Sequence, residues 1–201
     1  MKFLEKYGLL GAFYMIYCWI MTRLFYHKAR IIRFPFDLRG GKYINLGEGL
    51  TLGKYCRFEV FPHLMVGDER FKIRFGKNVQ INDNVHICAM ESVKIGDNVL
   101  MASHVFISDN SHGSYAGDEQ DSSPDIPPIE RKYSTAPVRI GDNCWIGEGV
   151  IIMPGVEIGF GCIIGAHSVV NSNIPDRTIA VGAPARVVKI WDSVEKHWVS
   201  V

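Results

Sequence analysis

The hydrophobic positions along this chain recur every six residues. The clearest series of large aliphatic residues is Ile140, Ile146, Ile152, Ile158, Ile164 and Val170. The same spacing begins earlier at Leu46, Phe75 and Ile95. Strands joined by hairpins recur at intervals of about 8–12 residues, so this period is too short for an ordinary β-sandwich. It predicts short strands and turns in which three hexads form one triangular coil of roughly 18 residues, stacked into a solenoid.

Each hexad has the same types of residue at corresponding positions. The first position holds a large aliphatic residue that should point inward, and the second is often glycine. The third and fourth positions favour Asp, Asn, Gly or Pro, which tolerate turn geometry and left-handed backbone angles. The fifth position is small or β-branched and is expected to pack inward beside the next coil. Its occupants include Val79, Val85, Val99, Val105, Cys144, Val150, Val156, Cys162 and Ser168.

The repeat is interrupted at three places. It slips near Pro62 and again near Glu91. The large break covers residues 108–137, which include His112 and several glycines and prolines. We predict a loop ejected from the solenoid, and a long loop inside a compact domain usually carries function.

The N-terminal segment is apolar and has basic residues on both sides. Residues 8–22 carry no charge, and Lys6 and Arg23 flank them. This run is short for a membrane-spanning helix of roughly 17–25 residues, and it lacks the cleavage pattern of a signal peptide. Two expectations stay open for residues 8–26. They form either a helix packed on the protein or its oligomer, or an interfacial helix in peripheral contact with anionic lipid.

Composition narrows the classes of partner. The 22 basic and 21 acidic residues give a net charge of +1, which offers no reason to expect nucleic acid. Hydrophobic residues make up 47% of the 201 residues, enough for a packed core. We expect a helical segment over 1–34, a β-helical domain over 35–190 with the ejected loop 108–137, and a C-terminal tail over 191–201.

The cysteines favour a structural role. There are five, an odd number, and no CxxC pair occurs, so a disulfide framework or a structural zinc site is not expected. Cys56, Cys144 and Cys162 share one repeat position that needs a small buried side chain. We predict small core residues in a reducing compartment.

Two segments carry a family resemblance, IGDNVLMASHVFISDNSHG and VRIGDNCWIGEGVIIMPGVEIGFGCIIGAHSVV. They resemble the hexapeptide-repeat acyltransferases, in particular the galactoside and maltose O-acetyltransferases and the surface-polysaccharide O-acetyltransferases. The resemblance covers roughly Asp37 to Ile190. It implies an all-β fold, a left-handed parallel β-helix, assembled as a homotrimer with active sites between subunits. It also implies acetyl-CoA as co-substrate, with no metal required.

The resemblance indicates two residues at the acceptor. His112 ends the hexad ISDNSH, where the family has its catalytic histidine. A neutral imidazole can remove the proton of a sugar hydroxyl as its oxygen attacks a thioester. Asn82 takes the place of the usual glycine in INDNVH and aligns with a family asparagine that holds the acceptor. We expect Asn82 and His112 on different faces of one prism, so that they meet across a subunit boundary.

The same resemblance indicates a CoA groove along the C-terminal coils. Trp145 is the outward residue of IGDNCW, where the family has tryptophan beside CoA and the neighbouring subunit. Gly147 and Ala166 match family positions at which small residues let the pantetheine arm approach the backbone. Arg186 and Lys189 follow the bend GAP and could bind the CoA phosphates.

The resulting hypothesis is an O-acetyltransferase that acts on a sugar or glycan of lipopolysaccharide, O-antigen or capsule. It would work in the cytoplasm or at the inner face of the cytoplasmic membrane. A small free sugar or a xenobiotic is the alternative acceptor, and the choice between acetyl and a longer acyl group stays open. Two other classes also stay open: a metal enzyme similar to the γ-class carbonic anhydrases, and a non-catalytic trimeric scaffold.

Overall fold

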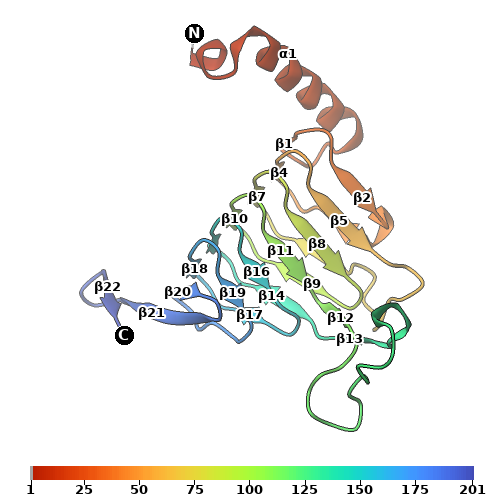
Figure 1. Ribbon diagram of the computed structural model, residues 1–201. Coiled ribbons are helices and arrows are strands. Elements are labelled where there is room, and N and C mark those ends of the chain that lie inside the picture. Colours follow the sequence, from red (N-terminus) through yellow and green to blue (C-terminus); the bar gives the residue numbers. More distant parts are fainter. Residues whose placement is uncertain (1) are drawn as a thin grey trace.

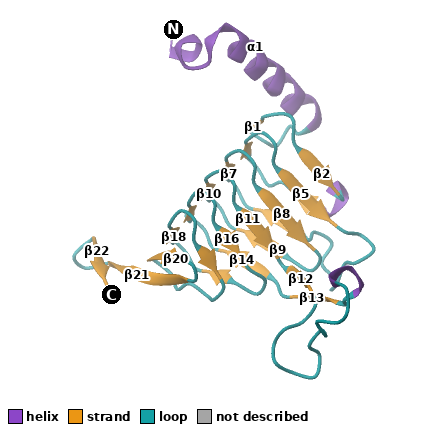
Figure 2. Ribbon diagram, viewed as in Figure 1, coloured by secondary structure: helices purple, strands orange, loops and turns teal. Residues whose placement is uncertain are grey.

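The computed structural model describes residues 2–201, with side chains from Leu4 onward. One long helix, α1 (Lys2–Phe25), projects from the end of a tapering stack of short strands (Figure 1). Figure 2 shows that the rest of the chain is strand and turn, apart from two short 3-10 helices at Gly41–Tyr43 and Pro128–Glu130.

Three parallel sheets form the sides of the stack. The first holds β1 (Ile31–Ile32), β4 (Thr51–Leu52), β7 (Gln80–Ile81), β10 (Leu100–Met101), β15 (Trp145–Ile146), β18 (Ile163–Ile164) and β20 (Thr178–Gly182). The second holds β2 (Asp37–Arg39), β5 (Arg57–Val60), β8 (His86–Ala89), β11 (Phe106–Ser108), β16 (Ile151–Ile152) and β19 (Val169–Val170). The third holds β3 (Ile44–Asn45), β6 (Ile73–Phe75), β9 (Val93–Ile95), β14 (Val138–Ile140) and β17 (Glu157–Ile158).

The chain visits these three sheets in turn, and each circuit makes one coil. Trp145 of β15 pairs with Ile163 of β18, and Ile151 of β16 pairs with Val169 of β19, so partners in successive coils are 18 residues apart. The predicted six-residue period is therefore confirmed, because each hexad supplies one strand and one turn.

The inside of the stack is the hydrophobic core. The first-position series from Ile140 to Val170 and all nine of the named fifth-position residues are buried, and Leu46 is partly buried. The five cysteines are buried and unpaired, which confirms the prediction of small core residues. Burial raises the pKa of the Cys56 thiol to about 11, so it stays protonated and unreactive at neutral pH.

The turns have the backbone geometry expected of the fourth hexad position. His104 and His167 adopt left-handed conformations with φ of 61° and 57°, in the same way as asparagines at equivalent turns. Both side chains are exposed, so these histidines are solvated turn residues.

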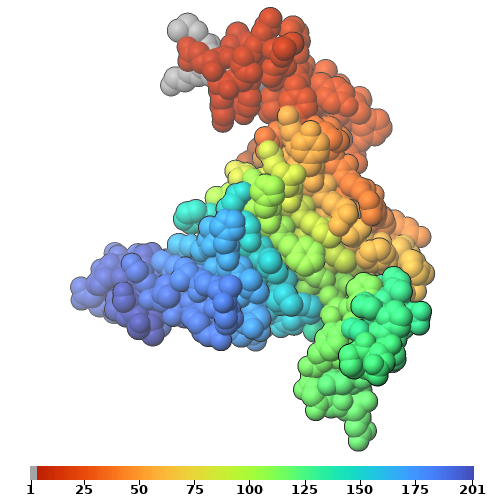
Figure 3. Space-filling view, in the orientation of Figure 1, coloured from red at the N-terminus to blue at the C-terminus, as the bar shows by residue number. Residues whose placement is uncertain are grey.

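The ejected loop and the C-terminus project from the body (Figure 3). Within the loop, β12 (Asn110–His112) pairs with β13 (Tyr133–Thr135) in antiparallel fashion. At the C-terminus, β21 (Ala185–Asp192) and β22 (His197–Ser200) form a hairpin that continues the first sheet, which thereby gains its eighth and ninth strands. The expected tail is therefore part of a strand pair, because β21 crosses the expected boundary after residue 190.

Helix α1 is bent and largely exposed. Gly8 has a non-helical backbone (φ 64°, ψ 178°). Nearer the body, the Tyr14 hydroxyl donates to the Phe34 carbonyl at 2.7 Å, and the buried Thr22 hydroxyl accepts from the Ile32 amide at 2.9 Å. An 18-residue stretch within Leu4–Phe25 has a mean hydropathy of 1.4, so by length and composition the helix could cross a membrane. The helix is longer than the uncharged run over residues 8–22, because it continues past Lys6 and Arg23.

Candidate active site

His112 ends strand β12, just after the second sheet gives way to the ejected loop. Its strand is held by pairing with β13, in which His112 lies opposite Tyr133 and Asn110 lies opposite Thr135. The His112 side chain is exposed. The sequence-predicted base is therefore presented on a short antiparallel ribbon that is anchored at the corner of the prism.

The imidazole of His112 is oriented by two contacts from the loop. Its Nδ1 lies 3.2 Å from the backbone carbonyl oxygen of Pro128, and its ring lies 4.5 Å from the ring of Tyr133, centre to centre. A carbonyl oxygen can only accept, so in the neutral tautomer that makes this bond Nδ1 carries the proton. The lone pair of Nε2 is then free to accept a proton from a substrate.

The loop around His112 is internally braced. The Tyr115 hydroxyl donates to the His112 carbonyl at 2.6 Å, and Arg131 donates to the Tyr115 hydroxyl at 2.7 Å and to the Ile126 carbonyl at 2.8 Å. Beside the ribbon, Tyr133 also lines a cavity of about 610 Å³. Its other lining residues are Ser114, Gln120, Ser122, Lys132, Ser134 and Thr135.

The acidic residues nearest to His112 in the sequence have other partners. Asp109 is fully buried and accepts hydrogen bonds from three consecutive backbone amides. These belong to Met90, Glu91 and Ser92, at 2.9, 2.8 and 2.7 Å. Asp118 accepts from the Gln120 amide at 2.8 Å within the loop. Asp109 thus fixes the turn between β8 and β9, and the orientation of His112 comes from Pro128 and Tyr133 instead.

Asn82 lies at a different corner of the prism. It follows β7, where the chain turns from the first sheet to the second. Its backbone N–H donates to the Met101 carbonyl at 3.0 Å. His112 follows β11, where the chain leaves the second sheet. The structure therefore places the two residues on separate corners of one chain, as expected from the spacing of the hexads.

Gly147 and Ala166 stack on the same corner as Asn82, two and three coils further along. A Cβ atom at Gly147 would lie 2.7 Å from the backbone nitrogen of Ala166 and 2.8 Å from the Ile164 carbonyl oxygen. The close stacking of the coils thus requires glycine at this position, whatever binds there. Ala166 is exposed at its turn.

Trp145 and Lys189 share one row across the first sheet. Trp145 pairs with Ile163, Ile163 pairs with Ile179, and Ile179 pairs with Lys189 of β21. Trp145 is 51% exposed and presents a large aromatic surface to solvent in the single chain. Arg186 lies on the same strand as Lys189, is exposed, and donates to the Ala185 carbonyl at 2.8 Å. The five predicted CoA residues are thus gathered along the C-terminal half of this sheet.

Comparison with known proteins bears on the family of this chain. Residues 137–172 match the family described as bacterial transferase hexapeptide (six repeats). The chain is 42% identical over 198 residues to an Escherichia coli (strain K12) protein named "Putative lipopolysaccharide biosynthesis O-acetyl transferase WbbJ". That match covers 98% of this chain and 97% of the relative. The chain belongs to the hexapeptide-repeat acyltransferases.

Solved structures place this acyltransferase in the same group. A maltose O-acetyltransferase from Clostridium difficile 630 superposes with a TM-score of 0.59 at 28% identity, covering 92% of this chain and 90% of that one. A hexapeptide-repeat acetyltransferase from Vibrio cholerae O1 biovar eltor, solved with acetyl coenzyme A, has a TM-score of 0.61 at 27% identity. The match covers 76% of this chain and 74% of the Vibrio cholerae chain.

Several features of the acyltransferase site could not be found in the sequence. Pro128, Tyr133, Tyr115 and Arg131 lie in the ejected loop, where no periodicity indicates which residues meet. The only available signal was the length of the loop itself. Among residues 2–201 no group of three or more His, Cys, Asp or Glu side chains is placed to hold a metal ion within one chain.

A partly buried polar cluster also lies on the second sheet, outside the predicted site. The His86 ring donates from Nε2 to Glu59 at 2.7 Å and accepts at Nδ1 from Arg57 at 3.2 Å, which is the pattern of a neutral imidazole. Desolvation is the main cause that lowers the pKa of His86, and the nearby positive charges of Arg57 and Arg39 act in the same direction. The hydrogen bond to Glu59 opposes these effects without reversing them. The His86 side chain is only 25% exposed, because Arg57 and Glu59 cover its ring.

Proposed function

We propose that this acyltransferase moves an acetyl group from acetyl-CoA to a sugar hydroxyl of lipopolysaccharide, O-antigen or capsular polysaccharide. The similarity to WbbJ, which extends over nearly the whole of both chains, supports this acceptor class. The observation that carries the chemistry is the orientation of His112, whose Nδ1 is engaged by Pro128 while Nε2 is free.

His112 acts in this proposal as the general base. Nε2 removes the proton of the acceptor hydroxyl while the hydroxyl oxygen attacks the thioester carbonyl carbon, and a tetrahedral intermediate forms. Collapse of the intermediate breaks the carbon–sulfur bond, and the imidazolium returns its proton to the departing CoA sulfur. The products are an acetyl ester of the sugar and free CoA, and the neutral histidine is regenerated.

The proposed site is completed by a second copy of the chain. His112 lies on one corner of the prism, whereas Asn82, Gly147 and Ala166 lie on another. A homotrimer of left-handed β-helices, as the family implies, would bring the two corners together. Asn82 would then bind the acceptor, while Trp145 and the small residues of its corner hold CoA, with Arg186 and Lys189 at its phosphates.

We also propose that the protein works in the cytoplasm, in peripheral contact with the inner face of the membrane through residues 8–26. The exposed apolar side chains of α1 support this location. A peripheral membrane contact would suit an enzyme that acts on a lipid-linked glycan.

The decisive experiment incubates the protein with acetyl-CoA and candidate acceptors, follows the release of CoA, and identifies the product by mass. Acetylation of a lipid-linked or polymeric glycan supports the proposal, and acetylation of small free sugars alone overturns the acceptor class. Calorimetry with CoA tests the catalytic assignment separately. A trimer that does not bind CoA would instead be a scaffold.

A further inference from the structure

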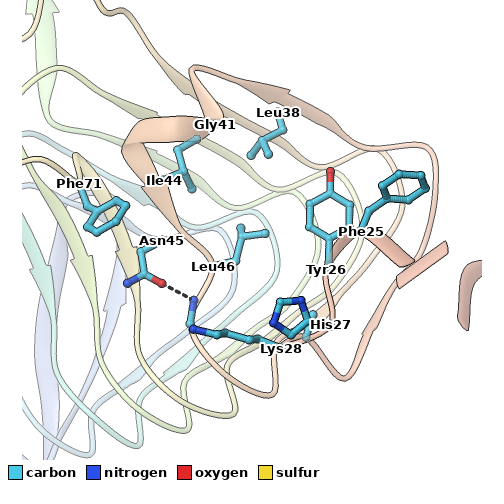
Figure 4. A pocket seen from close by; sticks show the side chains of 12 residues that line it. Phe25, Tyr26, His27, Lys28, Leu38, Gly41, Ile44, Asn45, Leu46 and Phe71 are labelled. Carbon is cyan, nitrogen blue, oxygen red and sulfur yellow. Dashed lines mark hydrogen bonds between the residues drawn. The ribbon is translucent and has the colours of Figure 1, made fainter. Parts of the chain in front are cut away.

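The base of α1 forms a cavity with an apolar lining and a basic rim. Figure 4 shows Phe25 and Tyr26 facing Leu38 and Leu46 across this cavity, with Lys28 along its edge. The cavity has a volume of about 390 Å³ and also includes Ile44, Asn45, Phe71 and His27 in its lining. This size and this mixture of lining residues are those of a ligand pocket.

Positive charge is concentrated next to this cavity. An adjoining cavity of about 410 Å³ shares Lys28 with it. Its charged lining residues are Arg23, Lys28, Arg30 and Lys77, with Glu48 as the single acidic one. Arg23 and Arg30 are engaged with backbone carbonyls and with Asn78. The Lys28 amine has no hydrogen bond or ion pair among the residues whose side chains are described, so it is available to an anion.

The helix above the cavity is apolar on every side. Leu9, Leu10, Phe13, Trp19 and Leu24 are all between 52% and 84% exposed. A helix that is apolar all round belongs in a protein core or a membrane. The basic residues at its base are where the phosphate groups of an anionic membrane surface would lie.

We propose that this end of the molecule binds an anionic membrane phospholipid, with one acyl chain in the cavity and the phosphate against Lys28 and His27. The inference rests on the proposed membrane contact and not on acetyl transfer. Strand β2 beside the cavity is three strand spacings from β11, the strand that leads to His112. The membrane-facing end is therefore about 14 Å from the base of the catalytic ribbon, measured along the sheet.

The first test measures binding of the full-length protein to vesicles of phosphatidylcholine with and without phosphatidylglycerol. We expect binding to require phosphatidylglycerol, and the double variant His27→Ala/Lys28→Ala to weaken it about five- to tenfold. The matched control is Lys196→Ala/His197→Ala, which removes the same two residue types from the exposed hairpin at the other end of the molecule. Equal binding by the two double variants overturns the proposal.

The second test addresses the cavity. Leu46→Asp places a charge on its apolar wall and should weaken phosphatidylglycerol binding about tenfold, the loss of roughly two buried methylene groups. Leu46→Met preserves the wall and should bind as the wild type does. Should Leu46→Asp fail to fold, native mass spectrometry of the wild-type protein supplies the answer. One retained phospholipid per chain supports the cavity, and none overturns it.

Two further outcomes separate this inference from its alternatives. The protein could fail to bind any vesicle while α1 is buried between subunits of the oligomer. That result would show that a second copy covers α1, and it overturns the proposal. The variant His112→Ala should bind vesicles as the wild type does. A failure of the acetyl-transfer hypothesis is therefore distinguishable from a failure of lipid binding.

Discussion

The Nδ1 atom of His112 lies 3.2 Å from the backbone carbonyl oxygen of Pro128, sixteen residues further along the chain. This contact spans the ejected loop and selects the neutral tautomer with a free Nε2. A loop that the repeat does not accommodate thereby orients the one side chain that the proposed reaction depends on.

Replacement of His112 removes the proposed base. We expect His112→Ala to lower the rate of acetyl transfer about 10²–10⁴-fold, the range for loss of a general base. The oligomer should be unchanged, since the side chain is exposed. The affinity for CoA should also be unchanged, since none of the residues proposed to hold CoA is altered. The measurement is CoA release at saturating acetyl-CoA. Turnover near the wild-type rate would reject His112 as the base.

Tyr133 positions the His112 ring. Its own ring packs at 4.5 Å, so Tyr133→Ala should let the imidazole move and lower kcat about tenfold. Tyr133→Phe keeps the aromatic face and should restore most of the activity. The KM for acetyl-CoA should stay near the wild-type value in both variants. Equal activity of the Ala and Phe variants would show that the ring contact is incidental.

Asp109 is expected to support stability, in contrast to Asp118. Asp109→Ala leaves three buried backbone amides without their acceptor and should lower the free energy of unfolding by about 3 kcal/mol. Asp118→Ala changes only an exposed turn and should shift the free energy of unfolding by less than about 0.5 kcal/mol. Denaturant titration compares the two, and similar values for both variants would contradict this assignment.

The His86 cluster predicts loss of stability in mild acid. The pKa of His86 is lowered in the folded protein, chiefly by desolvation, whereas in the unfolded chain it is near its ordinary value of about 6.5. Below that pH the unfolded state binds the proton first, so the free energy of unfolding falls as the pH decreases through 6.5 toward the folded-state pKa.

The measurement is denaturant unfolding across this pH range. His86→Gln should flatten the decline, while His63→Gln, at an exposed position, should leave it in place. A decline of the same steepness in His86→Gln would show that other groups cause it.

The period of six determined the architecture without any tertiary information. Each hexad has one inward residue in its strand, such as Ile146, and one after its turn, such as Val150. Only short stacked strands can bury both of these side chains. The turn positions of His104 and His167 were equally predictable, because asparagine-like left-handed geometry is a local property of the hexad. The family resemblance of the motifs likewise rests on sequence alone.

Only the tertiary structure decided what surrounds the site. Pro128 and Tyr133 reach His112 because the ejected loop folds back on itself, and contacts between distant loop residues leave no periodic trace in the sequence. The same holds for Glu59, which is buried against His86 although it occupies an outward position of its strand. The repeat dictates the inward side chains, since each must fill the same narrow core. The outward ones depend on which parts of the chain come to cover them.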